Sequence, residues 1–208
     1  MMKERGLLIV ISGPSGAGKG TICSELRKEM PNLVYSVSMT TRDPRVGEKE
    51  GINYFFRTKE QFEELLAQGD FLEYAKVYDN YYGTPKAHVM DLLDEGKHVI
   101  LEIDIQGAMQ VKDAFSDGVF IYIVPPSLSV LSNRLNGRGT DAQDVINKRL
   151  SLASSELALA HRYDYIVVND ILDEAVEKVA SILRAEACKI SRNKEKIQDI
   201  YKQYMTKE

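Results

Sequence analysis

The stretch GPSGAGKG, residues 13–20, decides the fold of this chain. A phosphate-binding loop has a glycine, any four residues and then Gly-Lys-Ser/Thr, and it lies between a buried strand and a helix. Gly13, Gly18 and Lys19 occupy the required places. Gly20 stands where the motif has a hydroxyl that contacts magnesium, so the stretch departs from the pattern at its last position.

The residues on both sides of this loop fit the motif. LLIVIS, residues 7–12, is an apolar run with β-branched residues, which is typical of a strand covered on both faces. A helical pattern follows from about 19 to 29 and ends before Pro31. Strand, glycine loop and helix in this order are the context that phosphate binding requires.

The rest of the chain predicts an α/β fold. Further core strands are expected at 98–104, 119–124 and 165–169, and helices at about 105–114, 128–135, 144–160 and from 173 onward. Alternating strands and helices of this kind indicate a parallel sheet between two helical layers, with the nucleotide at the carboxyl ends of the strands. This core is predicted to span residues 1–35 and 91–208.

Residues 36–90 break the alternation and predict an inserted α+β subdomain. Its strand patterns alternate apolar and polar residues, and Thr58 with Gln61 forms a capping box for the helix between them. A second atypical stretch, polar and rich in glycine, predicts a short lid at about 134–150. The tail after about residue 188 continues a helical pattern of mixed charge, which suits a solvated helix end or a subunit contact.

Composition excludes some function classes. The 208 residues include 27 basic and 31 acidic ones, a balance that argues against a dedicated nucleic-acid binder. The first apolar run is too short for a signal sequence or a membrane span, so a cytoplasmic protein with reduced Cys23 and Cys188 is expected. His88, His98 and His161 lack metal-ligand spacing, and structural roles are expected for them.

Two features point to phosphate chemistry. Backbone N–H groups from 15 to 19 can surround a phosphate at the helix N-terminus, and Lys19 can follow the transferred group. Arg42 and Arg45 flank Pro44 on a stiffened loop, where two guanidinium groups can grip one phosphate. Taken alone, these arginines fit a solvated charged loop better than a phosphate clamp.

Several short motifs, read together, resemble the guanylate kinase family over essentially the whole chain. They are the phosphate loop, TTRDPRVGE, NYYGTP, LEIDIQG, RLNGRGT, INKRL and YIVVND, in the order and spacing of the family. The resemblance implies an enzyme that phosphorylates GMP with ATP, giving GDP and ADP by direct in-line transfer, with Mg²⁺ as cofactor. ATP and GMP are then the partners, with no nucleic acid and no membrane.

The resemblance also implies roles for individual residues. The ATP-binding set is Gly13, Pro14, Ser15, Gly16, Ala17, Gly18, Lys19, Gly20, Thr21 and Asn169. The GMP-binding set is Ser38, Arg42, Arg45, Tyr54, Glu73, Tyr82, Gly83, Thr84, Glu102 and Asp104. The catalytic set is Lys19, Arg42, Arg134, Arg138 and Arg149, the last three around the lid.

The chemistry of the base agrees with this mapping. Guanine presents two N–H donors on one edge, which suit a carboxylate at Glu73, whereas adenine would leave that carboxylate unpaired. Hydroxyls at Ser38 and Thr84 can donate to guanine O6 or N7. Thr84 precedes Pro85, so a helix N-cap is an alternative or additional role for it.

Gly20 bears on how magnesium is held. A Gly-Lys-Gly-Thr ending resembles the loop of adenylate kinases, so the metal is expected mainly on ATP phosphates and waters. Glu102 and Asp104 would orient those waters, with Thr21 as a further contributor. Replacing Gly20 by serine is therefore expected to keep the fold and to change magnesium dependence only modestly.

Three functions are compatible with these residues. The first is phosphorylation of GMP, with dGMP as a further acceptor because the sequence does not separate ribose from deoxyribose. The second is the same reaction with AMP or dGMP as main acceptor. The third is a non-catalytic guanylate-kinase-like module that binds phosphopeptides, which the intact Lys19, Arg138 and Arg149 disfavour. The sequence does not indicate the oligomeric state, and a homo-oligomer is compatible with it.

Overall fold

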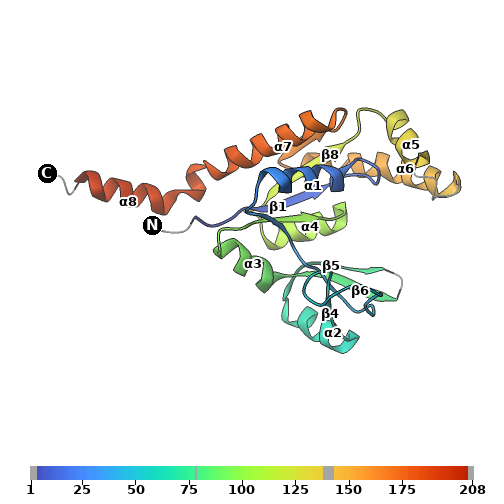
Figure 1. Ribbon diagram of the computed structural model, residues 1–208, viewed down its shortest axis with the longest axis horizontal. Helices are drawn as coiled ribbons and strands as arrows, with labels where there is room; N and C mark the ends of the chain where they lie inside the picture. The colour runs from blue at the N-terminus through green and yellow to red at the C-terminus, as the bar shows by residue number, and fades with distance from the viewer. Residues whose placement is uncertain (1–3, 78, 138–142, 206–208) are drawn as a thin grey trace.

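The computed structural model describes residues 4–77, 79–137 and 143–205, and it has a central parallel sheet (Figure 1). Five strands lie in the order β2-β7-β1-β8-β9, and every neighbouring pair is parallel. Their bounds are β1 Leu8–Ser12, β2 Leu33–Tyr35, β7 His98–Glu102, β8 Val119–Val124 and β9 Tyr165–Val168. The predicted α/β fold class is confirmed.

Helices cover both faces of this sheet because β1 is apolar on both. Leu7, Ile9 and Ile11 pack with α1 (Lys19–Glu29) and α7 (Leu172–Ala187). Leu8 and Val10 face the other way and pack with α3 (Lys86–Asp94) and α4 (Ile105–Ala114). Successive side chains of a strand point to opposite faces, so a run without polar residues requires cover on both.

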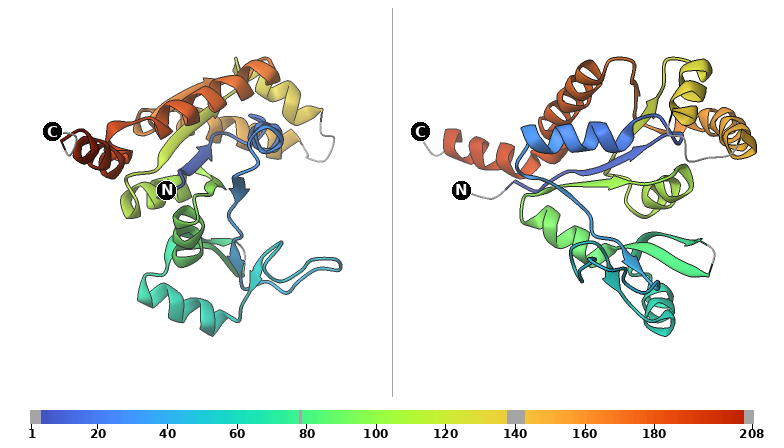
Figure 2. Two further views of the ribbon diagram at one scale, coloured as in Figure 1. Left: turned by 60° about the vertical axis from the view of Figure 1, so that its left-hand side comes forward. Right: turned by 45° about the vertical axis from the view of Figure 1, so that its right-hand side comes forward.

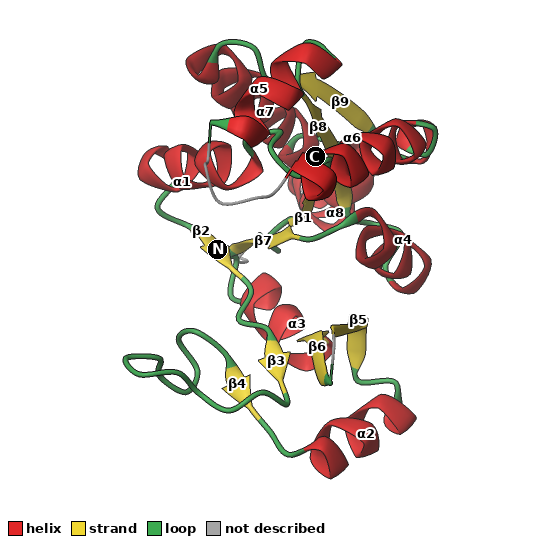
Figure 3. Cartoon of the chain, turned by 90° about the vertical axis from the view of Figure 1, so that its right-hand side faces the viewer, coloured by secondary structure: helices red, strands yellow, loops and turns green. Residues whose placement is uncertain are grey.

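A second sheet lies apart from the first (Figure 3). Its strands lie in the order β4-β3-β6-β5, with bounds β3 Met39–Thr40, β4 Phe55–Phe56, β5 Phe71–Val77 and β6 Asn80–Pro85. Helix α2, Lys59–Gln68, covers it through Phe62, whose ring stacks on that of Phe71 with centroids 4.3 Å apart. The capping box of Thr58 and Gln61 is confirmed at the start of α2.

Helices α5 (Leu128–Asn136) and α6 (Gln143–Leu157) lie beside the phosphate-loop end of the core (Figure 2). They share a small apolar core built from Leu131, Leu135 and Ile146. The predicted lid at 134–150 falls on the ends of these two helices and the segment between them. Residues 138–142, including Arg138, lie outside the described residues.

The structure corrects several predicted boundaries. Residues 33–35 form an additional edge strand, β2, which is too short to leave a clear pattern. The strand expected to end at Asp104 ends at Glu102, because Asp104 caps α4 by accepting from the Gly107 N–H at 2.8 Å. The helices expected at 128–135 and 144–160 are α5 and α6 with slightly different ends.

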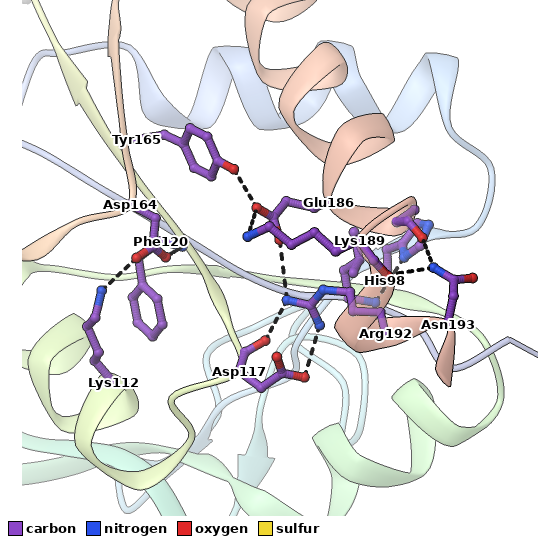
Figure 4. Close-up of polar contacts among 12 residues, drawn as sticks. His98, Lys112, Asp117, Phe120, Asp164, Tyr165, Glu186, Lys189, Arg192 and Asn193 are labelled. Atoms are coloured by element: carbon purple, nitrogen blue, oxygen red, sulfur yellow. Dashed lines mark hydrogen bonds and ion pairs between the residues drawn. The ribbon is translucent and has the colours of Figure 1, made fainter. Parts of the chain in front are cut away.

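The C-terminal helix is interrupted rather than continuous. Helix α7 ends at Ala187, a short 3₁₀ turn spans Ile190–Arg192, and α8, Lys194–Met205, runs away from the sheet (Figure 1). Figure 4 shows what holds the bend: buried Glu186 contacts Tyr165, Lys189 and Arg192. These contacts fix the start of α8 on the core.

His98 links the start of β7 to the first strand. The Leu7 N–H donates to His98 Nδ1 at 3.0 Å, so this ring nitrogen must be unprotonated in the folded chain. Burial lowers the pKa of His98 from its ordinary value of 6.5. The structural role of His98 is therefore to accept this hydrogen bond from Leu7.

This bond predicts a pH dependence of stability. The unfolded chain takes up a proton at His98 at a higher pH than the folded chain, so stability is lost as pH falls below about 6.5. In His98→Asn the amide oxygen keeps an acceptor near Nδ1 without titrating, and the free energy of unfolding should fall less between pH 7 and pH 5. Urea unfolding across this range measures the difference. His161→Gln is the control, and equal slopes in wild type and His98→Asn would contradict the assignment.

Candidate functional site

The phosphate loop joins β1 to α1 at the carboxyl edge of the parallel sheet. Gly18 is the N-cap residue of α1, with φ of 90°, and it offers no capping side chain to the first turn. The first N–H groups of a helix have no intrahelical acceptor, and the helix dipole adds positive charge there. The predicted residues from Gly13 to Thr21 therefore lie at a helix N-terminus, where the backbone geometry suits an anion.

Asn169 supports this loop from the end of β9. Its side-chain Nδ2 donates to the Ala17 carbonyl at 2.7 Å, and its backbone N–H donates to Val124 at 2.7 Å. Arg134 Nη2 donates to the Asn169 carbonyl at 3.0 Å, which connects α5 to the same point. A hollow of about 320 Å³ opens here, lined by Gly16, Gly18, Thr21, Arg134, Asn169, Asp170 and Leu172. It brings together predicted ATP-binding and lid residues.

Two cationic side chains reach the loop itself. Lys19 Nζ donates to the Gly13 carbonyl at 2.6 Å and to that of Pro14 at 3.2 Å. Arg149 Nη1, from α6, donates to Ser15 Oγ at 3.1 Å. Both cations therefore lie against the phosphate loop. Of the three predicted lid arginines, Arg134 and Arg149 are in contact with the loop or its support.

A second cationic group lies on the inserted sheet. Arg42 Nη2 contacts both carboxylate oxygens of Glu48 at 3.0 Å, and its guanidinium lies over the Tyr54 ring at 5.5 Å. Tyr54 and Tyr82 meet edge to face with centroids 6.0 Å apart. Arg45 is exposed, and its backbone N–H donates to Glu48 at 2.8 Å. The predicted phosphate clamp is thus assembled around one carboxylate.

Sequence reasoning missed the part that Glu48 plays. This carboxylate holds Arg42 by an ion pair and fixes the Arg45 backbone, and these contacts keep the pKa of Glu48 below its ordinary value. Arg42 and Glu48 side chains are only 16% and 19% exposed, so this pair is shielded more than a surface ion pair. Its position inside the TTRDPRVGE motif, six residues after Arg42, was the available signal.

The predicted base-reading residues form a third group. Glu73 and Thr84 are cross-strand partners on β5 and β6, and Thr84 Oγ1 donates to Glu73 Oε1 at 2.6 Å. Burial raises the pKa of Glu73, and the nearby Asp104 carboxylate acts in the same direction. The alternative N-cap role for Thr84 is wrong: Pro85 occupies that place in α3 without a capping bond, and the Thr84 hydroxyl is directed to Glu73.

Ser38 lines the same hollow as Thr84, and the absence of a side chain at Gly83 lets β5 pack closely against β6. A second hollow, of about 210 Å³, is lined by Tyr35, Ser36, Ser38, Thr84, Ile100, Leu101, Glu102 and Ile103. At Gly83 a side chain would meet the Phe71 ring at 2.8 Å and the Glu73 carbonyl at 3.0 Å. The predicted guanine contacts are therefore brought together beside the carboxyl end of β7.

Glu102 connects this hollow to the phosphate loop. It ends β7, lines the second hollow, and holds its carboxylate 3.4 Å from the position of a Cβ on Gly20. Asp104 lies two residues on, exposed, with one oxygen engaged in the α4 cap. The described residues contain no cluster of three or more metal-ligating side chains. A divalent ion here would need non-protein ligands in addition to these two carboxylates.

Other reactive groups lie apart from this chemistry. Cys23 is buried in the core, and burial raises its pKa to about 12, so it is inert as a thiolate. Cys188 is a free, exposed thiol at the end of α7. Within the described ranges, no helix is long and apolar enough to cross a membrane.

Comparison with known proteins gives consistent results. The family model described as Guanylate kinase matches residues 5–186. The chain is 54% identical over 194 residues to a guanylate kinase of Caldanaerobacter subterraneus subsp. tengcongensis, covering 93% of this chain and 94% of the relative. It is 55% identical over 194 residues to a guanylate kinase of Clostridium tetani, with 93% of each covered.

A solved structure agrees with these relatives. The crystal structure of guanylate kinase from Anaplasma phagocytophilum superposes with a TM-score of 0.68 at 36% identity, covering 92% of both chains.

The loop geometry predicts unequal effects of substitution at Gly18 and Gly20. A Cβ on Gly18 would lie 2.3 Å from Asn169 Nδ2, in a backbone conformation that L side chains rarely adopt. Gly18→Ala should therefore lower the free energy of unfolding by about 1–3 kcal/mol. Gly20 lies inside α1 and meets Glu102 only at ordinary contact distance, so Gly20→Ala or Gly20→Ser should stay within about 1 kcal/mol of wild type. Chemical denaturation measures both, and equal losses would contradict the model of the loop.

Proposed function

The chain belongs to the guanylate kinase family and phosphorylates GMP at the expense of ATP; we propose how its residues divide this work. One side of the cleft binds the phosphates of ATP, and the other binds GMP. Glu102 lies where the two sides meet. The non-catalytic alternative is disfavoured because Lys19 and Arg149 both contact the phosphate loop.

The donor side neutralises the charge of the transferred group. Phosphoryl transfer leaves the protein little covalent work, so alignment and charge stabilisation supply the rate. Backbone N–H groups of the loop hold the β-phosphate, and Lys19 exchanges its carbonyl contacts for phosphate oxygens. Arg134 and Arg149 add positive charge from α5 and α6, and Arg138 is proposed to do so from the segment between them.

The acceptor side binds the phosphate and the base of GMP separately. Arg42, Arg45, Tyr54 and Tyr82 bind the phosphate, and Glu48 acts on it only by positioning the two arginines. Glu73 accepts from the two N–H donors of guanine, and Ser38 offers a hydroxyl to its other edge. The one hydroxyl proton of Thr84 is donated to Glu73, so Thr84 contributes to the base site by holding that carboxylate, and it donates to guanine only by releasing this bond. The attacking atom is a phosphate oxygen that is already anionic, so no general base is needed.

One observation carries this arrangement: Glu102 touches both half-sites. Its carboxylate lies against Gly20 of the phosphate loop, and it lines the hollow that Ser38 and Thr84 also line. A base bound in that hollow is therefore next to the phosphate loop, at the carboxyl edge of the parallel sheet. This adjacency supports direct transfer between the two nucleotides.

The residues present fit a magnesium ion held together with ATP. Mg²⁺ is commonly bound by one or two carboxylates, waters and substrate phosphates, and Glu102 and Asp104 are the exposed carboxylates at this edge. We propose that these two residues orient the waters of the metal, with Thr21 beside them. When bound, the ion supplies charge neutralisation at the phosphates. Gly20 needs no hydroxyl in this arrangement.

Replacing Lys19 tests the donor side. In Lys19→Met the loop keeps its length and apolar stem but loses the cation that follows the transferred group. The kcat for GDP formation should fall on the order of 10²- to 10³-fold, with GMP binding by calorimetry unchanged. Lys59→Met, an exposed lysine on α2, is the matched control. Near-normal kcat in Lys19→Met would remove the lysine from the proposed mechanism.

Replacing Glu73 tests base recognition and its pH dependence. In Glu73→Gln an amide N–H faces the guanine donors, so kcat/KM for GMP should fall on the order of 10³-fold, while the low value for AMP should rise because no unpaired carboxylate faces adenine. The raised pKa predicts that wild-type selectivity for GMP over AMP declines as pH falls, starting above the ordinary glutamate value of 4.5. AMP carries the same phosphate and corrects for its titration.

The matched control for this prediction is Glu63→Gln, an exposed carboxylate on α2. Steady-state rates from pH 5 to pH 8 measure the selectivity. A Glu73→Gln enzyme that keeps its GMP preference would show that another group reads the base.

A further inference from the structure

The side chain of Gln110 on α4 forms hydrogen bonds with both backbone polar groups of Tyr74 on β5. The Tyr74 N–H donates to Gln110 Oε1 at 3.0 Å, and Gln110 Nε2 donates to the Tyr74 carbonyl at 3.1 Å. The two residues are 36 positions apart, and they connect the core to the inserted sheet. The side-chain amide thus acts as a substitute strand partner.

The edge position of β5 explains why such a partner is needed. β5 ends the order β4-β3-β6-β5, so one row of its N–H and C=O groups faces away from β6. Those of Tyr74 face α4, where Gln110 pairs with both. A glutamine side-chain amide presents an N–H donor and a C=O acceptor side by side, so it can pair with the N–H and the C=O of one strand residue at the same time.

The residue next to Tyr74 is the buried carboxylate Glu73. A β-bulge between Phe71 and Glu73 shifts the register of β5, and Leu72 at the bulge packs in the main core. Bulges redirect side chains, but the bulged residues also lose regular pairing, so their position needs other support. The bulge therefore aims Glu73, and the Gln110 contact fixes the strand immediately after it.

Helix α4 also touches the carboxylate itself. A Cβ on Gly107 would lie 3.2 Å from Glu73 Oε2, so the helix backbone passes close to that oxygen. Gly107 and Gln110 are three residues apart and share one face of the helix. The same face of α4 thus packs against the Glu73 carboxylate and anchors the next residue of its strand.

We propose that Gln110 is a positioning residue that sets the selectivity for guanine. It holds β5 on α4 so that both Glu73 oxygens stay in place for the N1–H and 2-amino donors of the base. The proposal rests on the proposed role of Glu73 and deepens it. Gln110 itself touches neither nucleotide in this scheme, and its effect passes through the strand.

Gln110→Met tests the proposal, because methionine has a similar length and no amide. The substrates are GMP, IMP, which lacks only the 2-amino group, and AMP. The KM for GMP should rise about tenfold with kcat nearly unchanged, in line with the loss of two hydrogen bonds. IMP has no 2-amino group, so it needs only one of the two Glu73 oxygens. Its KM should therefore rise less than the KM for GMP, and the preference for GMP over IMP should shrink. The kcat/KM for AMP should stay at its wild-type value.

Two further variants make the result specific. Gln110→Glu keeps an acceptor for the Tyr74 N–H but no donor for its carbonyl, and it should fall between wild type and Gln110→Met. It also decides the question if the methionine variant does not fold. Gln68→Met, the same change at an exposed position of α2, should match wild type.

The outcomes separate cleanly. An unchanged GMP-over-IMP ratio in folded Gln110→Met and Gln110→Glu overturns the proposal. Equal losses with GMP, IMP and AMP also overturn it, because they indicate a general loss of structure. If wild-type enzyme does not discriminate GMP from AMP, the assignment of Glu73 fails instead, independently of Gln110.

Discussion

β1 lies between β7 and β8 in parallel register, and all five of its residues are buried. This alignment is the constraint on which the cleft depends, because parallel strands end at a common edge. The phosphate loop after β1, the carboxylates after β7 and Asn169 after β9 therefore meet without any long connection. The buried strands before them fix where each of these groups lies, and hydrogen bonds such as the Asp104 cap and the Asn169–Ala17 bond orient them.

In the proposed arrangement, recognition of GMP follows a different physical strategy from binding of the ATP phosphates. There the phosphate loop uses backbone N–H groups and the cations of Lys19 and Arg149, which tolerate many phosphate esters. Glu73 is a buried carboxylate whose charge is costly unless it finds donors, so it penalises a base that lacks them. Thr84 satisfies one of its oxygens, and α4 holds its strand. Selectivity thus depends on how rigidly one strand is held.

Features that depend on a periodic or contiguous stretch of residues were predicted from the sequence. The apolar strands, the loop at 13–20 between strand and helix, and the capping box are local patterns, and the structure has them to within a few residues. Sequence reasoning missed β2, since three residues show no period, and the bend at Cys188, which depends on tertiary contacts of Glu186. The Thr84 hydroxyl had two local explanations, and only the cross-strand neighbour decided between them. Glu48 and Gln110 act through contacts that a linear pattern does not encode.

The central claim is that ATP and GMP occupy one cleft together and exchange a phosphoryl group directly. Initial rates measured over a matrix of ATP and GMP concentrations test it, with ADP and GDP quantified separately and AMP as the comparison acceptor. The account predicts double-reciprocal lines that intersect, ADP and GDP formed in equal amounts, and little turnover of AMP. Parallel lines, or ADP formed without GDP, would contradict it.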